Sequence, residues 1–253
     1  MDWEFNTRDR GPYWDRLGRW AQCRQTSSEG LTKLHNPSPI TISDRQICEA
    51  LSIYAISPNE GQIAKIREYI DLLLRWNRSV GLTSVTDPVE IVGRHFGESM
   101  YGSKMLPVEN CRLVDIGTGA GFPGLALKII SPGIQVILIE SNKKKCAFLS
   151  EVVRNLSLID VEVRAERFEQ IRPETIQANI ITSRAVGEFK RLLRWSTNGL
   201  ARRGHLMLWL GAEDSTRIAS TPGWNWQPAA KIPDSQRRFI LVGRPIEASI
   251  SQQ

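Results

Sequence analysis

The sequence has few of the residues that bind metal ions or form disulfide frameworks. Its 253 residues include four cysteines and three histidines, all widely separated. The cysteines, Cys23, Cys48, Cys111 and Cys146, follow one another at intervals of 25, 63 and 35 residues. These intervals match neither a zinc-binding pair nor a dense disulfide framework. We therefore expect reduced thiols and no metal site in a cytoplasmic protein.

Long apolar runs are also missing. No stretch approaches the roughly 20 residues that a membrane-spanning helix needs, and Met1–Asn6 lack the basic and apolar parts of a signal peptide. Hydrophobic residues make up 41% of the chain and charged residues 24%, which excludes a fibrous or wholly disordered protein. We expect a soluble protein that is not exported and does not bind membranes.

The excess positive charge is confined to the C-terminal part of the chain. The formal net charge is +6 in total, −1 over residues 1–110 and +7 over residues 111–253. Two clusters stand out, one of Lys143, Lys144 and Lys145 and an acid-free run that holds Lys190, Arg191, Arg194, Arg202 and Arg203. Such clusters attract polyanions and make nucleic acid a candidate partner, although solvated surface residues give the same pattern.

The chain divides into three segments by pattern. Residues 1–43 show no sustained periodicity, and we interpret them as an N-terminal extension of uncertain order. Residues 44–110 are interpreted as a helical cap. Residues 111–253 alternate between β-rich runs and amphipathic helices, which is typical of a doubly wound, mostly parallel α/β sheet. Strands are predicted at 112–116, 135–139, 161–165, 179–183, 205–210 and 238–242, and helices at 123–130, 143–156 and 188–200.

The helical cap contains two helix start signals. Ser57 and Asp87 each precede a proline and stand three residues before a glutamate, as capping residues do. The first signal predicts a helix from Pro58 to about Asn77, and the second predicts a helix from Pro88 to about Tyr101.

A glycine-rich loop follows the first predicted strand. The strand runs into Gly117, Gly119, Gly121 and Gly124 before a helix begins. Glycine at a strand-to-helix turn supplies positive φ angles and lets a ligand approach the backbone, so the pattern predicts a nucleotide-type cofactor loop rather than a plain turn. The letters from Gly119 to Gly124 also satisfy the dinucleotide fingerprint G-x-G-x-x-G and do not by themselves choose the cofactor.

Neighbouring acids favour S-adenosylmethionine over NAD. Asp115, at the strand end, would repel a pyrophosphate and attract the cationic groups of S-adenosylmethionine. Glu140 ends the second strand, where a carboxylate accepts hydrogen bonds from the ribose of either cofactor. Ala165 and Glu166 follow the third strand, and their backbone groups are candidates for reading the adenine edge, although a capping role for Glu166 has equal weight.

These residues resemble the cofactor motif of a known family. The run from Leu113 to Gly124 is similar to that of the bacterial ribosomal small subunit methyltransferase G family, also called glucose-inhibited division protein B. The agreement continues at Leu82–Thr83 with Asp87–Pro88, Arg94–Phe96, Glu140–Leu149, Arg164–Glu166 and Ser183–Ala185, and covers about residues 57–243.

The resemblance implies a class I, Rossmann-like methyltransferase that moves a methyl group from S-adenosylmethionine to N7 of a guanine in 16S ribosomal RNA. Its partner would be 16S rRNA or the small ribosomal subunit, and the protein would be a monomer. The family's cofactor contacts fall on Gly117, Phe122, Ala165, Glu166 and Arg184, of which Phe122 and Arg184 come from the resemblance alone. Guanine N7 has a free lone pair, so we expect no catalytic base. Arg94 and His95 are candidates for the rim of the site, and we expect His95 not to be catalytic.

The sequence departs from the family pattern at three positions. Gly81 stands where asparagine is usual, Glu98 replaces an aspartate, and Leu210 replaces a lysine. Three alternatives stay open, and the missing lysine favours the first of them. They are an S-adenosylmethionine enzyme with another RNA or small-molecule substrate, a noncatalytic RNA-binding paralogue, and an NAD-dependent oxidoreductase.

Overall fold

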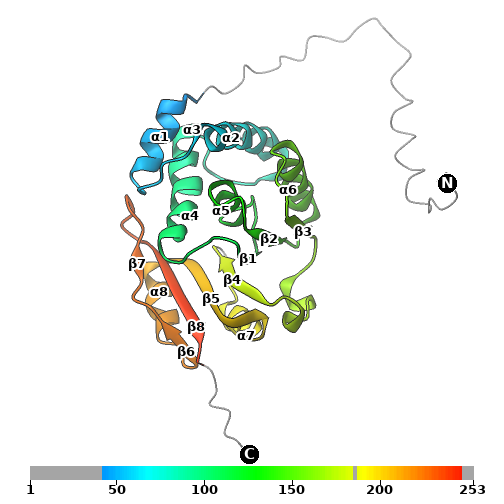
Figure 1. Cartoon of the computed structure of the whole chain (residues 1–253), viewed down its shortest axis with the longest axis vertical. Helices are drawn as coiled ribbons and strands as arrows, with labels where there is room; N and C mark the ends of the chain where they lie inside the picture. The colour runs from blue at the N-terminus through cyan, green and yellow to red at the C-terminus, as the bar shows by residue number, and fades with distance from the viewer. Residues whose placement is uncertain (1–41, 185–186, 247–253) are drawn as a thin grey trace, which may run out of the picture. The chain divides into compact units, whose positions relative to one another are not determined.

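One mixed sheet forms the centre of the described part of the chain (Figure 1). The computed structural model describes residues 42–184 and 187–246, all within a unit that covers residues 39–253. Its parallel strands lie in the order β3 (Val161–Arg164), β2 (Gln135–Ile139), β1 (Arg112–Ile116), β4 (Ala178–Ser183) and β5 (Leu200–Gly211). The antiparallel strands β8 (Arg238–Pro245), β6 (Trp224–Trp226) and β7 (Ala230–Lys231) complete it. The predicted doubly wound, mostly parallel sheet is confirmed.

Both faces of the sheet are buried, which explains why its central strands are continuous apolar runs. Successive side chains of a strand point to opposite faces. Leu113 and Leu138 accordingly belong to the hydrophobic cluster on one face, whereas Val114 and Ile137 belong to the cluster on the other. Each of these four side chains is at most 4% exposed.

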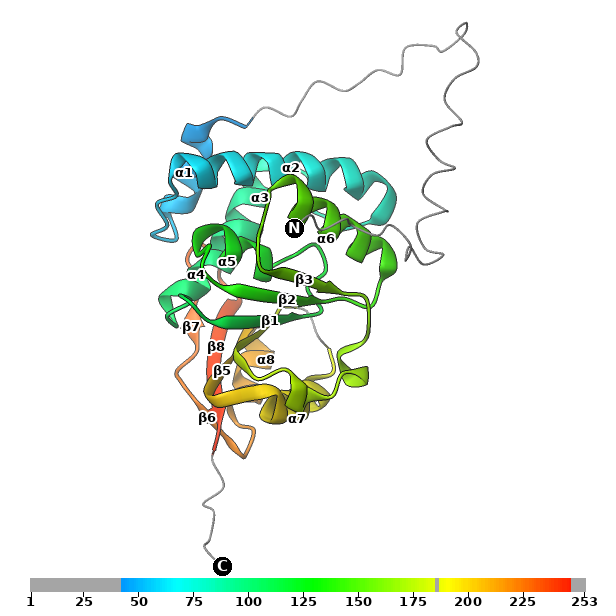
Figure 2. The same ribbon diagram turned by 45° about the vertical axis from the view of Figure 1, so that its right-hand side comes forward.

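Helices cover the two faces as separate layers (Figure 2). The helices α5 (Gly124–Ile130) and α6 (Lys143–Asn155) pack on one face together with the helical cap. The helices α7 (Phe189–Gly199) and α8 (Ala212–Ala219) pack on the other. Two short 3-10 turns, Phe168–Gln170 and Pro173–Thr175, connect β3 to β4.

The helical cap consists of α1 (Asp44–Ser52), α2 (Glu60–Val80), α3 (Pro88–Ile91), a π-helical turn (Val92–Gly97), α4 (Glu98–Tyr101) and a 3-10 turn (Gly102–Lys104). The prediction that Ser57 caps the first helix is wrong. Asn59 caps α2. Its side-chain oxygen accepts a hydrogen bond from the backbone N–H of Gln62, and the side-chain oxygen of Gln62 accepts one from the backbone N–H of Asn59. Asp87 caps α3 as predicted, with its Oδ1 2.8 Å from the backbone nitrogen of Glu90.

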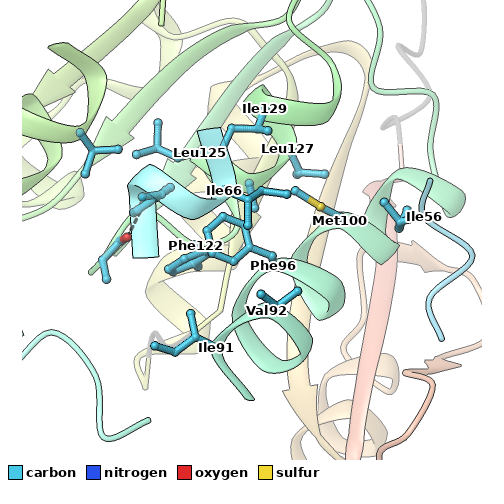
Figure 3. Close-up of a cluster of buried hydrophobic side chains, with 14 of the residues drawn as sticks. Ile56, Ile66, Ile91, Val92, Phe96, Met100, Phe122, Leu125, Leu127 and Ile129 are labelled. Atoms are coloured by element: carbon cyan, nitrogen blue, oxygen red, sulfur yellow. Dashed lines mark hydrogen bonds between the residues drawn. The ribbon is translucent and has the colours of Figure 1, made fainter. Parts of the chain in front are cut away.

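Aromatic side chains join the helical cap to the glycine loop. Phe96, from the π-helical turn, meets Phe122 edge to face at a centroid distance of 5.0 Å, and both lie in one cluster of buried apolar side chains (Figure 3). Tyr69 of α2 stacks on Phe122 at 5.3 Å and meets Phe96 edge to face at the same centroid distance. The loop is therefore supported by residues that lie about 50 positions or fewer upstream in the sequence.

Several elements were not predicted. The helices α1 and α8 and the short strands β6 and β7 have no prediction of their own, and β5 begins at Leu200 rather than at His205. The expectations for the N-terminal extension, apart from Ile42 and Ser43, lie outside the described residues, as do those for Cys23 and His35. Over the part of the chain that is described, no helix has the length and apolar character to cross a bilayer.

Candidate cofactor-binding site

The carboxyl ends of four parallel strands bring the predicted site residues to one edge of the sheet. The register pairs Ile116 of β1 with Ile139 of β2, and Ile139 with Arg164 of β3. The residues that follow these strand ends are Gly117, Glu140, Ala165 with Glu166 and, after β4, Arg184. The strands β2 and β3 lie on one side of β1, and β4 and β5 lie on the other. Ligands of such sheets usually bind at the carboxyl ends of the strands, at the point where the strand order changes direction.

The glycine loop uses most of its own backbone donors. The amide groups of Gly117 and Thr118 donate to the carbonyl of Ile139, and those of Gly121 and Phe122 donate to the carbonyl of Thr118. The glycines at 117, 119 and 121 all have positive φ angles, of 66°, 58° and 89°. A pyrophosphate needs several free N–H groups in such a loop, and these amides already have partners.

Asp115 holds the loop from below and does not face a ligand. Its side chain is completely buried. Its Oδ2 accepts the Thr118 hydroxyl at 2.6 Å and the Gly124 amide at 2.9 Å, and its Oδ1 accepts the Thr182 hydroxyl at 2.9 Å. The carboxylate that was expected to attract a cationic cofactor therefore also supports the loop. Burial raises the pKa of Asp115 to about 6, and the hydrogen bonds from Thr118, Gly124 and Thr182 oppose that rise.

The raised pKa of Asp115 predicts a specific pH dependence. Between about pH 4 and pH 6 the folded protein binds this proton more tightly than the unfolded chain, so the group's contribution to stability falls as pH rises. We expect the unfolding free energy of the wild type minus that of Asp115→Asn to decrease by about 2–2.5 kcal/mol from pH 4 to pH 7. Urea unfolding across this pH range measures the difference, and parallel curves for the two proteins would refute the assignment.

Tyr69 is a site residue that sequence reasoning missed. Its hydroxyl donates to the carbonyl of Ala120 at 2.5 Å, and its ring is completely buried. A Cβ atom on Gly121 would lie 2.1 Å from this hydroxyl, so glycine is required there for space as well as for its positive φ. A tyrosine within a helical apolar pattern carries no signal of such a contact, because its partner is 51 residues away.

Glu140 is prepared to accept hydrogen bonds from hydroxyl groups. Its carboxylate is 8% exposed, and its Oε2 and Oε1 each accept one backbone N–H, from Gly119 at 3.0 Å and from Asn142 at 2.8 Å. Each oxygen retains a second lone pair for a ligand. Ala165 is exposed and Glu166 half-buried beside it, at the end of the neighbouring strand.

Arg184 is fixed by the helical cap. Its Nη2 donates to the carbonyl of Arg94 at 2.8 Å and to Glu98 Oε2 at 3.0 Å, and Nη1 lies 3.5 Å from the Ser99 hydroxyl. The Glu98 carboxylate is 1% exposed and also pairs with Arg238 of β8 at 2.8 Å. Burial raises the pKa of Glu98, whereas the nearby arginines lower it. The predicted site residue Arg184 thus belongs to a buried ionic cluster.

His95 lies against the loop as a neutral side chain. Its ring stacks on Phe122 at a centroid distance of 5.1 Å, and its Nε2 is 2.7 Å from the Thr83 hydroxyl. Asn77 in turn holds the Thr83 amide and carbonyl. Burial lowers the pKa of His95 to about 3, and the charges of Arg184 and Arg94 add to this effect.

The lowered pKa of His95 predicts acid sensitivity. Below pH 6.5 the unfolded chain binds this proton before the folded protein does, so the group's contribution to stability is lost as pH falls toward 3. We expect the unfolding free energy of the wild type minus that of His95→Gln to increase by about 2–3 kcal/mol from pH 4.5 to pH 7. The sign is opposite to that for Asp115→Asn. A difference that stays constant over this range would mean that His95 is not buried in its neutral form.

The basic residues predicted as one run occupy two edges of the sheet. An open groove of about 700 Å³ is lined by three basic residues of α7, Lys190, Arg191 and Arg194. Its lining also includes the aromatic residues Phe168 and Trp195 and the acidic residues Glu169 and Glu174. Arg202 and Arg203 lie instead at the start of β5, at the opposite edge from the glycine loop. The residues of this acid-free run are therefore separated in space, because the chain passes along α7 between them. Lys143 and Lys144 are exposed in the first turn of α6, beside Glu140.

The donor and acceptor groups at the edge fit S-adenosylmethionine better than a dinucleotide. Glu140 supplies acceptors for ribose hydroxyls, and the loop offers few free N–H groups for phosphates. Within residues 42–184 and 187–246, no group of three or more histidine, cysteine, aspartate or glutamate side chains is arranged to hold a metal ion.

Comparisons with known proteins agree with this assignment. A family model described as rRNA small subunit methyltransferase G matches residues 62–224. The chain is 34% identical over 181 residues to Ribosomal RNA small subunit methyltransferase G of Chloroflexus aggregans, a match that covers 70% of this chain and 76% of that protein. It is 42% identical over 138 residues to the protein of the same name from Dichelobacter nodosus, with 54% and 64% covered.

A solved structure supports the fold. A SAM dependent methyltransferase from Aquifex aeolicus superposes with a TM-score of 0.51 at 17% identity, over 63% of this chain and 94% of that one. At this identity the likeness bears on the fold alone. It agrees with the class I methyltransferase architecture predicted from the motif.

Proposed function

Because the chain belongs to the rRNA small subunit methyltransferase G family, we propose that it transfers a methyl group from S-adenosylmethionine to N7 of a guanine in 16S rRNA. The observation that carries the proposal is the glycine loop with its amides already paired and Glu140 beside it. In this proposal residues 111–253 are the methyltransferase domain, and residues 44–110 form a cap that supports its loop. A cytoplasmic monomer that acts on the RNA or on the small subunit is part of the same proposal.

Six of the cofactor contacts are assigned by position and chemistry, whereas Phe122 and Arg184 are assigned from the family resemblance. Gly117, Gly119 and Gly121 let the cofactor approach the backbone of the loop, and Phe122, whose ring packs among Tyr69, Phe96 and His95, contributes its backbone to the same loop. Glu140 accepts the ribose hydroxyls, Ala165 and Glu166 read the adenine edge, and Arg184 binds at the methionine end. These eight residues are the proposed cofactor set. They come from the carboxyl ends of four of the five parallel strands, β1 to β4.

The chemistry asks for alignment rather than for proton transfer. When bound, S-adenosylmethionine supplies a methyl group on a sulfonium, which the unprotonated N7 of guanine accepts without losing a proton. The side chains of this site have to hold the two reactants in line and exclude water. His95 is neutral at pH 7 and therefore adds no charge beside a base that becomes cationic. No catalytic base is assigned.

Leu210 bears on the choice of RNA target. It is 6% exposed and packs in the cluster beneath α7 and α8, so the position expected to hold a lysine adds no cation to the edge. In the antiparallel pairing of β5 with β8, Arg238 lies opposite Gly211, the next residue. A guanidinium from β8 thus stands at the same edge, where it pairs with the Glu98 carboxylate, and we keep 16S rRNA as the substrate.

The test is transfer of labelled methyl from S-adenosylmethionine to 16S rRNA and to isolated small subunits that lack the family's modification. We expect incorporation into at least one of these two substrates. Cofactor binding without incorporation into either would contradict the proposal and would favour a noncatalytic RNA-binding protein. Binding of NADH in place of S-adenosylmethionine would favour an oxidoreductase.

A further inference from the structure

A second basic cleft lies at the edge of the sheet opposite the glycine loop. It has a volume of about 660 Å³, and its polar lining includes Arg202, Arg203, Asn225 and Arg244. The other lining residues that the structure describes are neutral, so no carboxylate contributes to its wall there. By contrast, the groove over α7 includes two glutamates.

An irregular pairing of two strands presents two of these arginines. Ala178 of β4 pairs with Leu200 of β5, and the next pair is Ile180 with His205, so β5 advances five residues while β4 advances two. The extra residues of β5 leave the ladder and form a bulge at its amino end.

The bulge is fixed by local backbone demands. Arg203 has a φ angle of 64°, which side-chain-bearing residues rarely adopt. At Gly204 a Cβ atom would lie 2.8 Å from the carbonyl oxygen of Ala178, so the strands approach too closely there for a side chain. A backbone held in a sparsely populated conformation next to a charged cleft is typical of a binding site.

The third arginine comes from a different strand. Arg244 lies near the end of β8 and pairs in register with Asn225 of β6. Burial lowers the pKa of His205, and the charge of Arg244 lowers it further, so the field of this arginine extends to the start of β5. Arg203 and Arg244, from two strands, thus line one cleft, and the planar fork of guanidinium matches the geometry of phosphate oxygens.

We propose that this cleft binds backbone phosphates of the RNA substrate, as an anchoring point separate from the cofactor edge. The proposal rests on the proposed function for its choice of RNA. The length of β5 from Leu206 to Gly211 places the cleft and the cofactor edge about 16 Å apart. An RNA segment that contacts both therefore has to be several nucleotides long. Phosphate contacts of this kind raise affinity and set register without reading the base sequence.

The test compares a double variant, Arg203→Ala with Arg244→Ala, with the wild type. A matched control is Arg45→Ala with Arg154→Ala, which removes the same charge from exposed arginines that pair with Glu49 and Glu151. Binding of a full-length 16S rRNA transcript is measured by filter retention at several salt concentrations. We expect the cleft variant to bind about tenfold more weakly and the slope of log affinity against log salt to be smaller by about 1–2, because each lost phosphate contact contributes about 0.7–0.9. The control is expected to match the wild type.

Further readouts separate the cleft from the methyl transfer itself. The affinity for S-adenosylmethionine and kcat at saturating RNA are expected to be unchanged in the cleft variant, because the cleft lies at the other edge of the sheet. RNA affinity and salt slope equal to those of the wild type would overturn the proposal and leave the methyltransferase assignment intact. If the wild type transfers no methyl group but the cleft variant still loses RNA affinity, the anchoring site stands and the proposed function fails. If the wild type binds inorganic pyrophosphate and the cleft variant does not, while both bind RNA with the same affinity, the RNA assignment would be overturned.

Discussion

Replacing Gly121 with alanine is expected to remove cofactor binding and to destabilise the fold. The new Cβ atom would lie 2.1 Å from the Tyr69 hydroxyl and 2.7 Å from Leu125 Cδ1. Holding a residue with a side chain at a φ of 89° destabilises the folded state by a further ~1–2 kcal/mol. Together with overpacking, we expect a loss of about 3–5 kcal/mol in the unfolding free energy. Calorimetric titration is expected to show an affinity for S-adenosylmethionine that is lower by about a hundredfold or more. A factor of ten in affinity corresponds to about 1.4 kcal/mol, so this loss corresponds to about 3 kcal/mol of binding free energy.

Two variants test the physical cause of this effect. Gly119→Ala also occupies a positive φ, but the nearest atom to its Cβ is the Gly117 carbonyl oxygen at 3.9 Å, so we expect a loss of only about 1–2 kcal/mol. Adding Tyr69→Phe to Gly121→Ala removes the closest clashing atom and is expected to recover part of the stability. If Gly119→Ala and Gly121→Ala are equally destabilising, the contact with Tyr69 is not the cause.

Replacing Glu98 with alanine is expected to have an effect of similar size on stability. The carboxylate is 1% exposed and pairs with both Arg184 and Arg238. Its removal leaves two guanidinium groups without their shared anion, and breaking a buried ion pair from one side typically costs about 3–5 kcal/mol. Because Arg184 loses the carboxylate that orients it, affinity for S-adenosylmethionine is also expected to fall. Thermal and urea unfolding, with calorimetric titration, measure the two effects.

Glu90 provides the matched control for this substitution. It pairs with Arg94 at 2.8 Å, but both side chains are more than 40% exposed, and exposed pairs contribute about 1 kcal/mol or less. Glu90→Ala is therefore expected to be nearly neutral. The conservative variant Glu98→Asp keeps the charge and is expected to retain most of the stability. A loss of less than about 1 kcal/mol in Glu98→Ala would show that the cluster does not hold the cap to the sheet.

The parallel core of the fold was predictable because its signals are local. Buried parallel strands are continuous apolar runs, and the predicted bounds of β1 and β2 agree with the structure. The strands β6 and β7 have two or three residues each and depend on pairing with β8, which no local pattern reveals. The π-helical turn at Val92–Gly97 lies inside a segment that reads as one continuous helix, so its altered winding was also not predicted.

The candidate site was predictable where its residues follow strand ends. Gly117 and Glu140 were predicted from motif and order, whereas Arg184 followed from the family resemblance, and strand register brings such positions together. The supporting residues Tyr69 and Arg238 were missed, because their contacts join parts of the chain more than 50 residues apart. Asp115 was expected to attract a cationic cofactor, but its burial and its hydrogen bonds to the loop were not predicted.

The most direct measurement is identification of the atom that receives the methyl group. 16S rRNA from a strain that lacks the family's enzyme is incubated with the wild-type protein and labelled S-adenosylmethionine, then digested to nucleosides and mapped by mass spectrometry. The account predicts that all label is found as 7-methylguanosine at one position. Label in a different nucleoside, or no label despite measurable binding of S-adenosylmethionine, would contradict it.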